Sequence, residues 1–155
     1  MSNTPDFWTS LISTLKTSEV VKLQTVANQI QDFTVSDDTL ALRAKWLNTA
    51  DVTCIMNVFK NYKGHIPVKT LSLSYNVEIG DKGAILVAES LPKSIESIGL
   101  VGCGIKDAGG EAILSWIKGA TQLKMICIEN NNFSTQLQQK YSDFAKRNPT
   151  ILVVT

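Results

Sequence analysis

The chain has 155 residues, of which 44% are hydrophobic and 19% charged, so it can form one domain with a sizeable buried core. Its formal net charge is +1 and its Lys and Arg residues are scattered, which argues against a nucleic-acid-binding protein. No apolar stretch is long enough to span a bilayer, and residues 1–7 lack the features of a signal peptide.

Three cysteines and one histidine leave little material for metal or nucleophilic chemistry. Cys54, Cys103 and Cys127 are odd in number and have no CxxC spacing. They predict reduced thiols in a cytoplasmic protein and not a disulfide framework or a metal site. His65 lies in a segment expected to be a loop. We therefore expect no metal, no cofactor and no catalytic residue.

The first third of the chain predicts two helices, over residues 7–15 and 18–33. In the second, Ser18 is expected to be the N-cap of an apolar stripe. The stripe consists of Val20, Leu23, Val26, Ala27 and Ile30. We expect residues 1–36 to form a helical cap that shields the first strand of the following sheet from edge pairing.

Residues 37–66 predict a strand and a helix with irregular spacing. Leu40 and Leu42 alternate as they would in a strand, and Asn48 can cap a helix that carries Ile55 and Phe59. The interval from this strand to the next is longer than the intervals that follow, and the amide position of the later units is lost. We interpret this segment as a degenerate copy of the unit described next.

Residues 67–155 repeat one pattern, in which apolar residues at positions 0, 3 and 5 precede an amide or a cysteine at position 8. The pattern recurs at nearly constant intervals, and its last copy is cut short by the end of the sequence. Its members are Val68, Leu71, Leu73 and Asn76; Ile95, Ile98, Leu100 and Cys103; Leu123, Ile126, Ile128 and Asn131; and finally Ile151 and Val154. The units are 67–94, 95–122 and 123–150, with a terminal strand at 151–155.

A helical pattern follows each of these strands. Asp81 and Asp107 occupy equivalent positions, and we expect each to be the N-cap of its own helix, as Ser134 is in the third unit. Their repetition at the same phase favours capping over a catalytic role. The glycines of the loops belong to no GxxxxGK[ST] or GxGxxG motif, so they predict tight turns and not phosphate binding.

This pattern resembles the leucine-rich repeat family and, within it, the ribonuclease-inhibitor-like class with an α-helix in each unit. The resemblance is carried by LSLSYNVEIGDKGAILVAESL, IGLVGCGIKDAGGEAILSWI and ICIENNNFS. It implies an α/β fold: a short right-handed solenoid with a parallel β-sheet on the concave face and α-helices on the convex face. In fold and size the chain is also similar to bacterial leucine-rich effector proteins, which would place it in a host cytosol.

The strand residues between the inward apolar positions are the predicted partner-binding surface. They are small, neutral or mildly apolar, whereas a solvated surface without a role more often carries Lys and Glu. They are Arg43, Thr70, Ser72, Ser74, Tyr75, Ser97, Gly99, Val101, Met125, Cys127 and Glu129, extended by Val153 and Thr155 on the last strand. Tyr75 and Met125 are the expected anchors. The alternative is that small residues merely suit a crowded sheet.

Trp8, Trp46 and Trp116 are expected to be partly buried, with Trp8 the best candidate for an exposed anchor. The loops after the strands, at 75–78, 101–104 and 129–132, form a second candidate surface. Cys127 should point to the concave face, but no neighbour in sequence offers it a general base.

The leading interpretation is a non-enzymatic module, monomeric on its own, that binds another protein and inhibits or regulates it. One alternative is an enzyme with an unrecognised site in the N-terminal helices. Another is a fragment of a longer leucine-rich repeat protein, since the sequence stops inside a strand at ILVVT.

Overall fold

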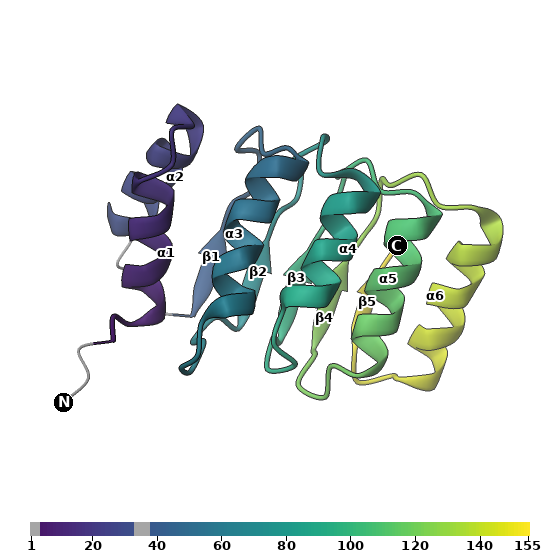
Figure 1. Ribbon diagram of the computed structural model, residues 1–155. Helices are drawn as coiled ribbons and strands as arrows, with labels where there is room; N and C mark the ends of the chain where they lie inside the picture. Colours follow the sequence, from purple (N-terminus) through teal and green to yellow (C-terminus); the bar gives the residue numbers. More distant parts are fainter. Residues whose placement is uncertain (1–3, 33–37) are drawn as a thin grey trace.

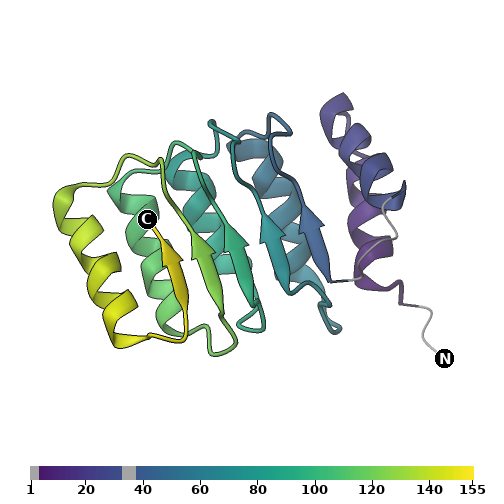
Figure 2. The same cartoon turned by 180° about the vertical axis from the view of Figure 1, so that it is seen from behind.

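The computed structural model describes residues 4–32 and 38–155, in which strands alternate with helices. The elements are α1 (Phe7–Lys16), α2 (Val21–Asp32), β1 (Thr39–Ala41), α3 (Thr49–Asn61), β2 (Thr70–Ser72), α4 (Gly80–Ser90), β3 (Ser97–Gly99), α5 (Asp107–Lys118), β4 (Met125–Cys127), α6 (Thr135–Arg147) and β5 (Leu152–Val154). The strands form one parallel sheet in the order β1-β2-β3-β4-β5. Helices α3 to α6 lie on one side of it (Figure 1), and Figure 2 shows the other side, which we call the strand face.

These observations confirm the predicted α/β repeat architecture with helices at the N-terminus. Within the described residues, no helix combines the length and the apolar character needed to cross a membrane.

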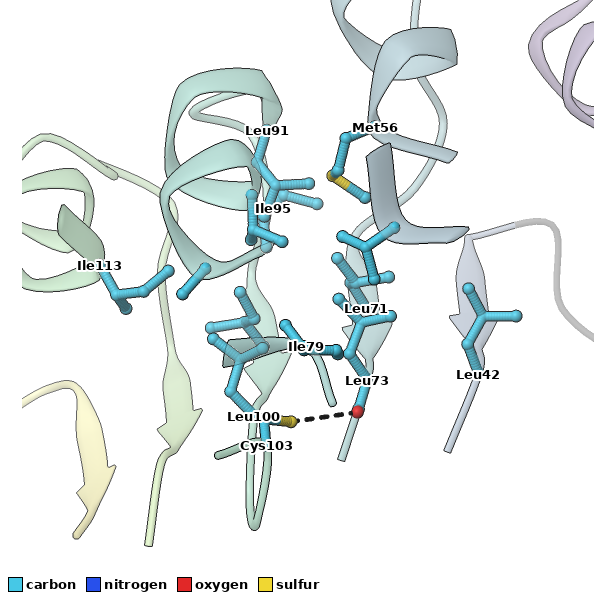
Figure 3. Packing of buried hydrophobic residues seen from close by; sticks show 14 of the residues in the cluster. Leu42, Met56, Leu71, Leu73, Ile79, Leu91, Ile95, Leu100, Cys103 and Ile113 are labelled. Atoms are coloured by element: carbon cyan, nitrogen blue, oxygen red, sulfur yellow. Dashed lines mark hydrogen bonds between the residues drawn. The ribbon is translucent and has the colours of Figure 1, made fainter. Parts of the chain in front are cut away.

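The core runs continuously between the sheet and the helices. Leu71, Leu73, Ile98 and Ile126 are almost completely buried, as the alternation along each short strand predicts. Figure 3 shows part of this cluster, and each buried leucine contributes roughly 2 kcal/mol by leaving water. No unit could bury this surface alone, so each unit depends on its neighbours.

Asn76 satisfies the backbone of the loop that follows β1. Its Oδ1 accepts hydrogen bonds from the amides of Lys45 and Leu47, both at 3.0 Å. Its Nδ2 donates to the carbonyls of Leu42 and Leu73 at 2.9 and 2.7 Å. Asn76 is fully buried, so these four bonds replace water for groups that would otherwise be unpaired.

The next two units continue this ladder. Asn131 Oδ1 accepts from the amides of Cys103 and Ile105, both at 3.1 Å, and its Nδ2 donates to Leu100 at 2.8 Å. The buried Cys103 thiol donates to the Leu73 carbonyl at 3.2 Å, a bond drawn in Figure 3. Position 8 of the repeated pattern therefore bonds to the backbone of the neighbouring unit in all three cases.

The irregular unit forms the expected strand and helix. Leu40 of β1 pairs with Leu71 of β2, and Leu71 pairs in turn with Ile98 of β3, so the first interval is the longer one, as predicted. Asn48 accepts a bond from the Asp51 amide, while the Asp51 carboxylate accepts from the Asn48 amide. The two residues therefore form a capping box at the start of α3.

The N-terminal helices pack on the β1 end of the solenoid. Phe7 of α1 lies edge-to-face against Phe59 of α3, with ring centroids 4.9 Å apart. The second helix begins later than predicted, at Val21, because the Ser18 hydroxyl accepts from the Val20 amide just before the helix. Val20 is 43% exposed, so its predicted place in the buried stripe was wrong. Residue 33 lies outside the described residues.

The prediction that Asp81 and Asp107 cap their own helices was wrong. Neither Asp81 nor Asp107 caps its own helix. Asp81 Oδ1 accepts instead from the amides of Lys106 and Gly109, at 2.8 and 2.9 Å, and so caps α5 of the next unit. Asp107 Oδ1 accepts from the Ser134 amide at 2.7 Å, at the start of α6. Both carboxylates link one unit to the next.

The register of the last strand also differs from the prediction. Ile126 pairs with Val153 and not with Val154, the residue that the phase of the repeat predicts. A shift of a single position exchanges the two faces of a strand. Val153 therefore packs against the core, while Leu152 is 58% exposed beside Met125. The expectation that Val153 faces a partner was wrong.

Candidate functional site

The strand face is lined mainly by small, half-buried side chains. These are Thr70, Ser72, Ser97, Gly99 and Cys127. A larger side chain would be crowded at Gly99, because a Cβ there would lie 3.0 Å from Ser74 Oγ and 3.4 Å from Ser72 Oγ. Larger groups flank this stretch, with exposed Arg43 and Tyr75 at one end and Met125, 36% exposed, at the other.

Two of the predicted partner-binding residues do not reach solvent. Ser74 is 5% exposed and Val101 is 7% exposed. Ser74 Oγ accepts a hydrogen bond from the Val101 amide at 3.1 Å, which links the ends of β2 and β3. Their assignment to a contact surface was wrong, because they lie where the chain leaves the strand and turns toward the loop.

Cys127 has the surroundings of an unreactive thiol. Burial raises its pKa above the usual value, and the Glu129 carboxylate raises it further, so the thiolate is disfavoured at neutral pH. One Glu129 oxygen, Oε2, is buried and bonds to no described residue. In the described part of the chain, no group of three or more His, Cys, Asp or Glu side chains could hold a metal ion.

Of the three tryptophans, only Trp8 is partly buried as predicted. Trp116 is buried, and its indole nitrogen donates to the Leu91 carbonyl at 3.3 Å. Trp8 is half-buried, with its ring edge-to-face against Phe7. Trp46 is 82% exposed, so the exposed anchor is Trp46 and not Trp8.

A shared backbone geometry explains where Trp46 lies. The residue two positions after the buried end of each of the first four strands has a left-handed conformation. These residues are Ala44 (φ 53°), Tyr75 (φ 63°), Gly102 (φ 61°) and Asn130 (φ 58°). Two positions further on, Trp46 (φ 60°) and Gly104 (φ 67°) are left-handed as well. Placing the irregular unit in register with its neighbours would have put Trp46 in this exposed loop.

Three large apolar side chains project from the first two of these loops. Trp46 is 82% exposed, Tyr75 44% and Val77 64%, and we call this group the aromatic edge. The Arg43 guanidinium lies over the Tyr75 ring, 4.6 Å from its centroid. The same ring also lies beside Gly102, where an added Cβ would be 3.3 Å from Tyr75 Cδ1.

A cleft of about 400 Å³ lies between α5 and α6 at the opposite end. It is lined by Lys118, Lys140, Asp143, Phe144, Arg147 and Asn148. Lys140 is already paired with Glu111 at 2.6 Å, and Lys118 and Arg147 occupy the last turns of their helices, where cations offset the helix dipole. These charges therefore have a structural explanation.

A family model described as "Leucine Rich repeat" matches residues 65–88 and 93–114, which cover β2 with most of α4 and β3 with most of α5. These two segments are leucine-rich repeats. A solved structure of Chaetomium Mex67:Mtr2 subunits is similar, with a TM-score of 0.58 and 17% sequence identity, covering 86% of this chain and 88% of that chain. At this identity the likeness shows the fold alone. No curated protein matches the chain in sequence.

Proposed function

We propose that this protein is a non-enzymatic leucine-rich repeat module that binds another protein through its strand face and the adjacent loops. The observation that carries the proposal is the Tyr75–Arg43 pair, an exposed aromatic ring with a guanidinium held over it. Aromatic and Arg side chains are the residues that most often dominate protein interfaces. Met125 adds a flexible apolar contact at the far end of the same face.

The similar fold supports this proposal, since the Chaetomium structure contains Mex67 and Mtr2 subunits together. In the proposed arrangement residues 1–36 are a cap, and residues 37–155 carry the units 37–66, 67–94, 95–122 and 123–150 and the strand at 151–155. The module is of the ribonuclease-inhibitor-like class, works as a monomer in a cytoplasm, and inhibits or regulates its partner.

Affinity capture followed by crosslinking tests this proposal with Tyr75→Asp and Met125→Arg. Both variants place a charge on the strand-face side, and we expect each to weaken partner binding at least tenfold. Ser115→Asp and Glu89→Arg introduce similar charges at exposed positions of α5 and α4 and should bind like the wild type. Wild-type affinity in both strand-face variants would rule the proposal out.

A further inference from the structure

Two residues of the aromatic edge, Trp46 and Tyr75, have an unfavourable left-handed backbone conformation. A left-handed conformation is readily adopted by Gly and tolerated by Asn, whereas large side chains rarely adopt it. At the equivalent positions the later units have Gly102, Gly104 and Asn130. The loops can therefore close without an aromatic residue, and the fold does not explain the choice of Trp46 and Tyr75. Strained residues of this kind are concentrated at functional sites.

The Trp46 backbone is held firmly while its side chain is free. The amides on both sides of it, of Lys45 and Leu47, donate to the buried Asn76. Its own carbonyl accepts a bond at 2.7 Å from Lys22, whose ammonium also pairs with Asp51 at 2.6 Å. Because the backbone is already fixed, binding costs conformational entropy only for the Trp46 side-chain torsions, which is the advantage of a partly preorganised contact.

The charges beside the aromatic edge are unevenly distributed. Arg43 and Lys45 belong to the same loop as Trp46, and neither forms an ion pair within residues 4–32 and 38–155. Glu78 follows Val77 in the second loop and is exposed. A partner carboxylate would therefore be attracted to the Arg43 side and repelled from the Val77 side.

The size of the aromatic edge argues against a second copy of this chain as the occupant. An aromatic side chain buries at most roughly 150–250 Å², and the exposed fractions are 82% for Trp46, 44% for Tyr75 and 64% for the smaller Val77. Together the three side chains therefore offer about half of the ~800 Å² per partner that a stable interface buries. A short segment with one apolar anchor suits this area better than a symmetric dimer does.

We infer that the aromatic edge docks a segment of a partner protein in which a carboxylate neighbours a large apolar side chain. The apolar side chain packs between Trp46 and Val77, and the carboxylate pairs with Arg43 or Lys45. This inference rests on the proposed protein-binding function and names the surface and the chemistry of its partner. It goes beyond that function in making Trp46, a loop residue outside the strand face, the main anchor.

A random-peptide display library panned against the immobilised full chain tests this inference. Enriched peptides should carry Asp or Glu within two positions of Leu, Ile, Phe or Trp. The most enriched peptide, synthesised and measured by fluorescence anisotropy, should bind Trp46→Gly at least tenfold more weakly than the wild type. Arg43→Gln should weaken binding less and reduce its dependence on salt.

Trp46→Gly copies the residue that stands at Gly104, so it should fold, and Trp46→Asn serves as a second variant if it does not. Leu152→Ala is the matched control, because Leu152 is an exposed apolar side chain at the opposite end of the sheet. That variant should bind the peptide like the wild type.

Several results would overturn the inference. They are a failure to enrich any peptide, enriched peptides without acidic residues, and equal affinity for the wild type and Trp46→Gly. Self-association that Trp46→Gly abolishes, or binding to phosphatidylserine vesicles in place of peptides, would assign the edge to a second copy or to a lipid surface. Loss of peptide binding in Met125→Arg but not in Trp46→Gly would overturn the inference while the strand-face function stands.

Discussion

The loops that follow the strands are built on one backbone but have two kinds of surface. In the first two units they carry Trp46, Tyr75 and Val77. In the next two, the corresponding positions hold Gly102, Gly104, Asn130 and Asn132. Both halves use left-handed residues and both are fixed by an asparagine of the amide ladder. The glycine and asparagine half shows what the fold requires, and the aromatic half shows what has been added to it.

The largest expected effect contrasts two glycines of the second half. In Gly104→Ala the new Cβ would collide with the Val77 carbonyl at a left-handed φ of 67°, so we expect the free energy of unfolding to fall by about 3 kcal/mol. Gly102→Ala meets only the Tyr75 ring and should cost about 1 kcal/mol. Urea unfolding measures both. Equal losses in the two variants would contradict this prediction, because they would show that the contact with the Val77 carbonyl adds nothing to the cost of the left-handed conformation.

A smaller loss of stability is expected at the hydrogen bond between Asp107 and Ser134, which joins α5 to α6 in the second half of the solenoid. Hydrogen bonds from the Ser134 side chain and amide hold the pKa of Asp107 below its ordinary value of 3.8. Because the folded-state pKa is lowered, this carboxylate stabilises the fold above that value and loses its effect as the pH falls further. Asp107→Ala should lower the melting temperature by a few degrees at pH 7. The difference from the wild type should shrink at pH 3, and parallel curves would contradict this reasoning.

The smallest effect, and the one of opposite sign, is expected in the aromatic half. Trp46→Asn relieves left-handed strain and removes a ring that is 82% exposed, so stability should rise by about 0.5 kcal/mol. Tyr75→Asn should gain less, because it also removes the contact with Arg43. Denaturant titration of both variants provides the measurement. A clear loss of stability in Trp46→Asn would mean that the ring supports the fold after all.

The repeated part of the fold could be predicted because its residues recur at a fixed spacing. Leu71 and Leu73 alternate along a strand, and Asn48 caps the helix that follows it directly. Asn76 was identified from its phase in the repeat, and in the structure it bonds to the backbone of the loop in the preceding unit. Such features follow from the spacing within each unit and from its repetition along the chain.

The errors arise where one unit acts on the next. Asp81 is placed like a cap in sequence, but the carboxylate reaches α5 because adjacent helices lie side by side. The shift in register at Val153 is invisible without the pairing partner. Trp46 was missed for a related reason, since its exposure depends on the register between the irregular unit and its neighbour. The composition of the strand face likewise did not show that Ser74 and Val101 are buried.

The unit that contains Asn76 and Asp81 holds its neighbours in two directions. Asn76 reaches back to complete the loop after β1, and Asp81 reaches forward to the start of α5. Nearest-neighbour terms of this kind dominate the cooperativity of repeat proteins. Opening this unit would release the Trp46 loop on one side and the α5 terminus on the other. The slowest amide hydrogen exchange should therefore be found in this unit, and the Trp46 loop should stay ordered only as long as this unit remains folded.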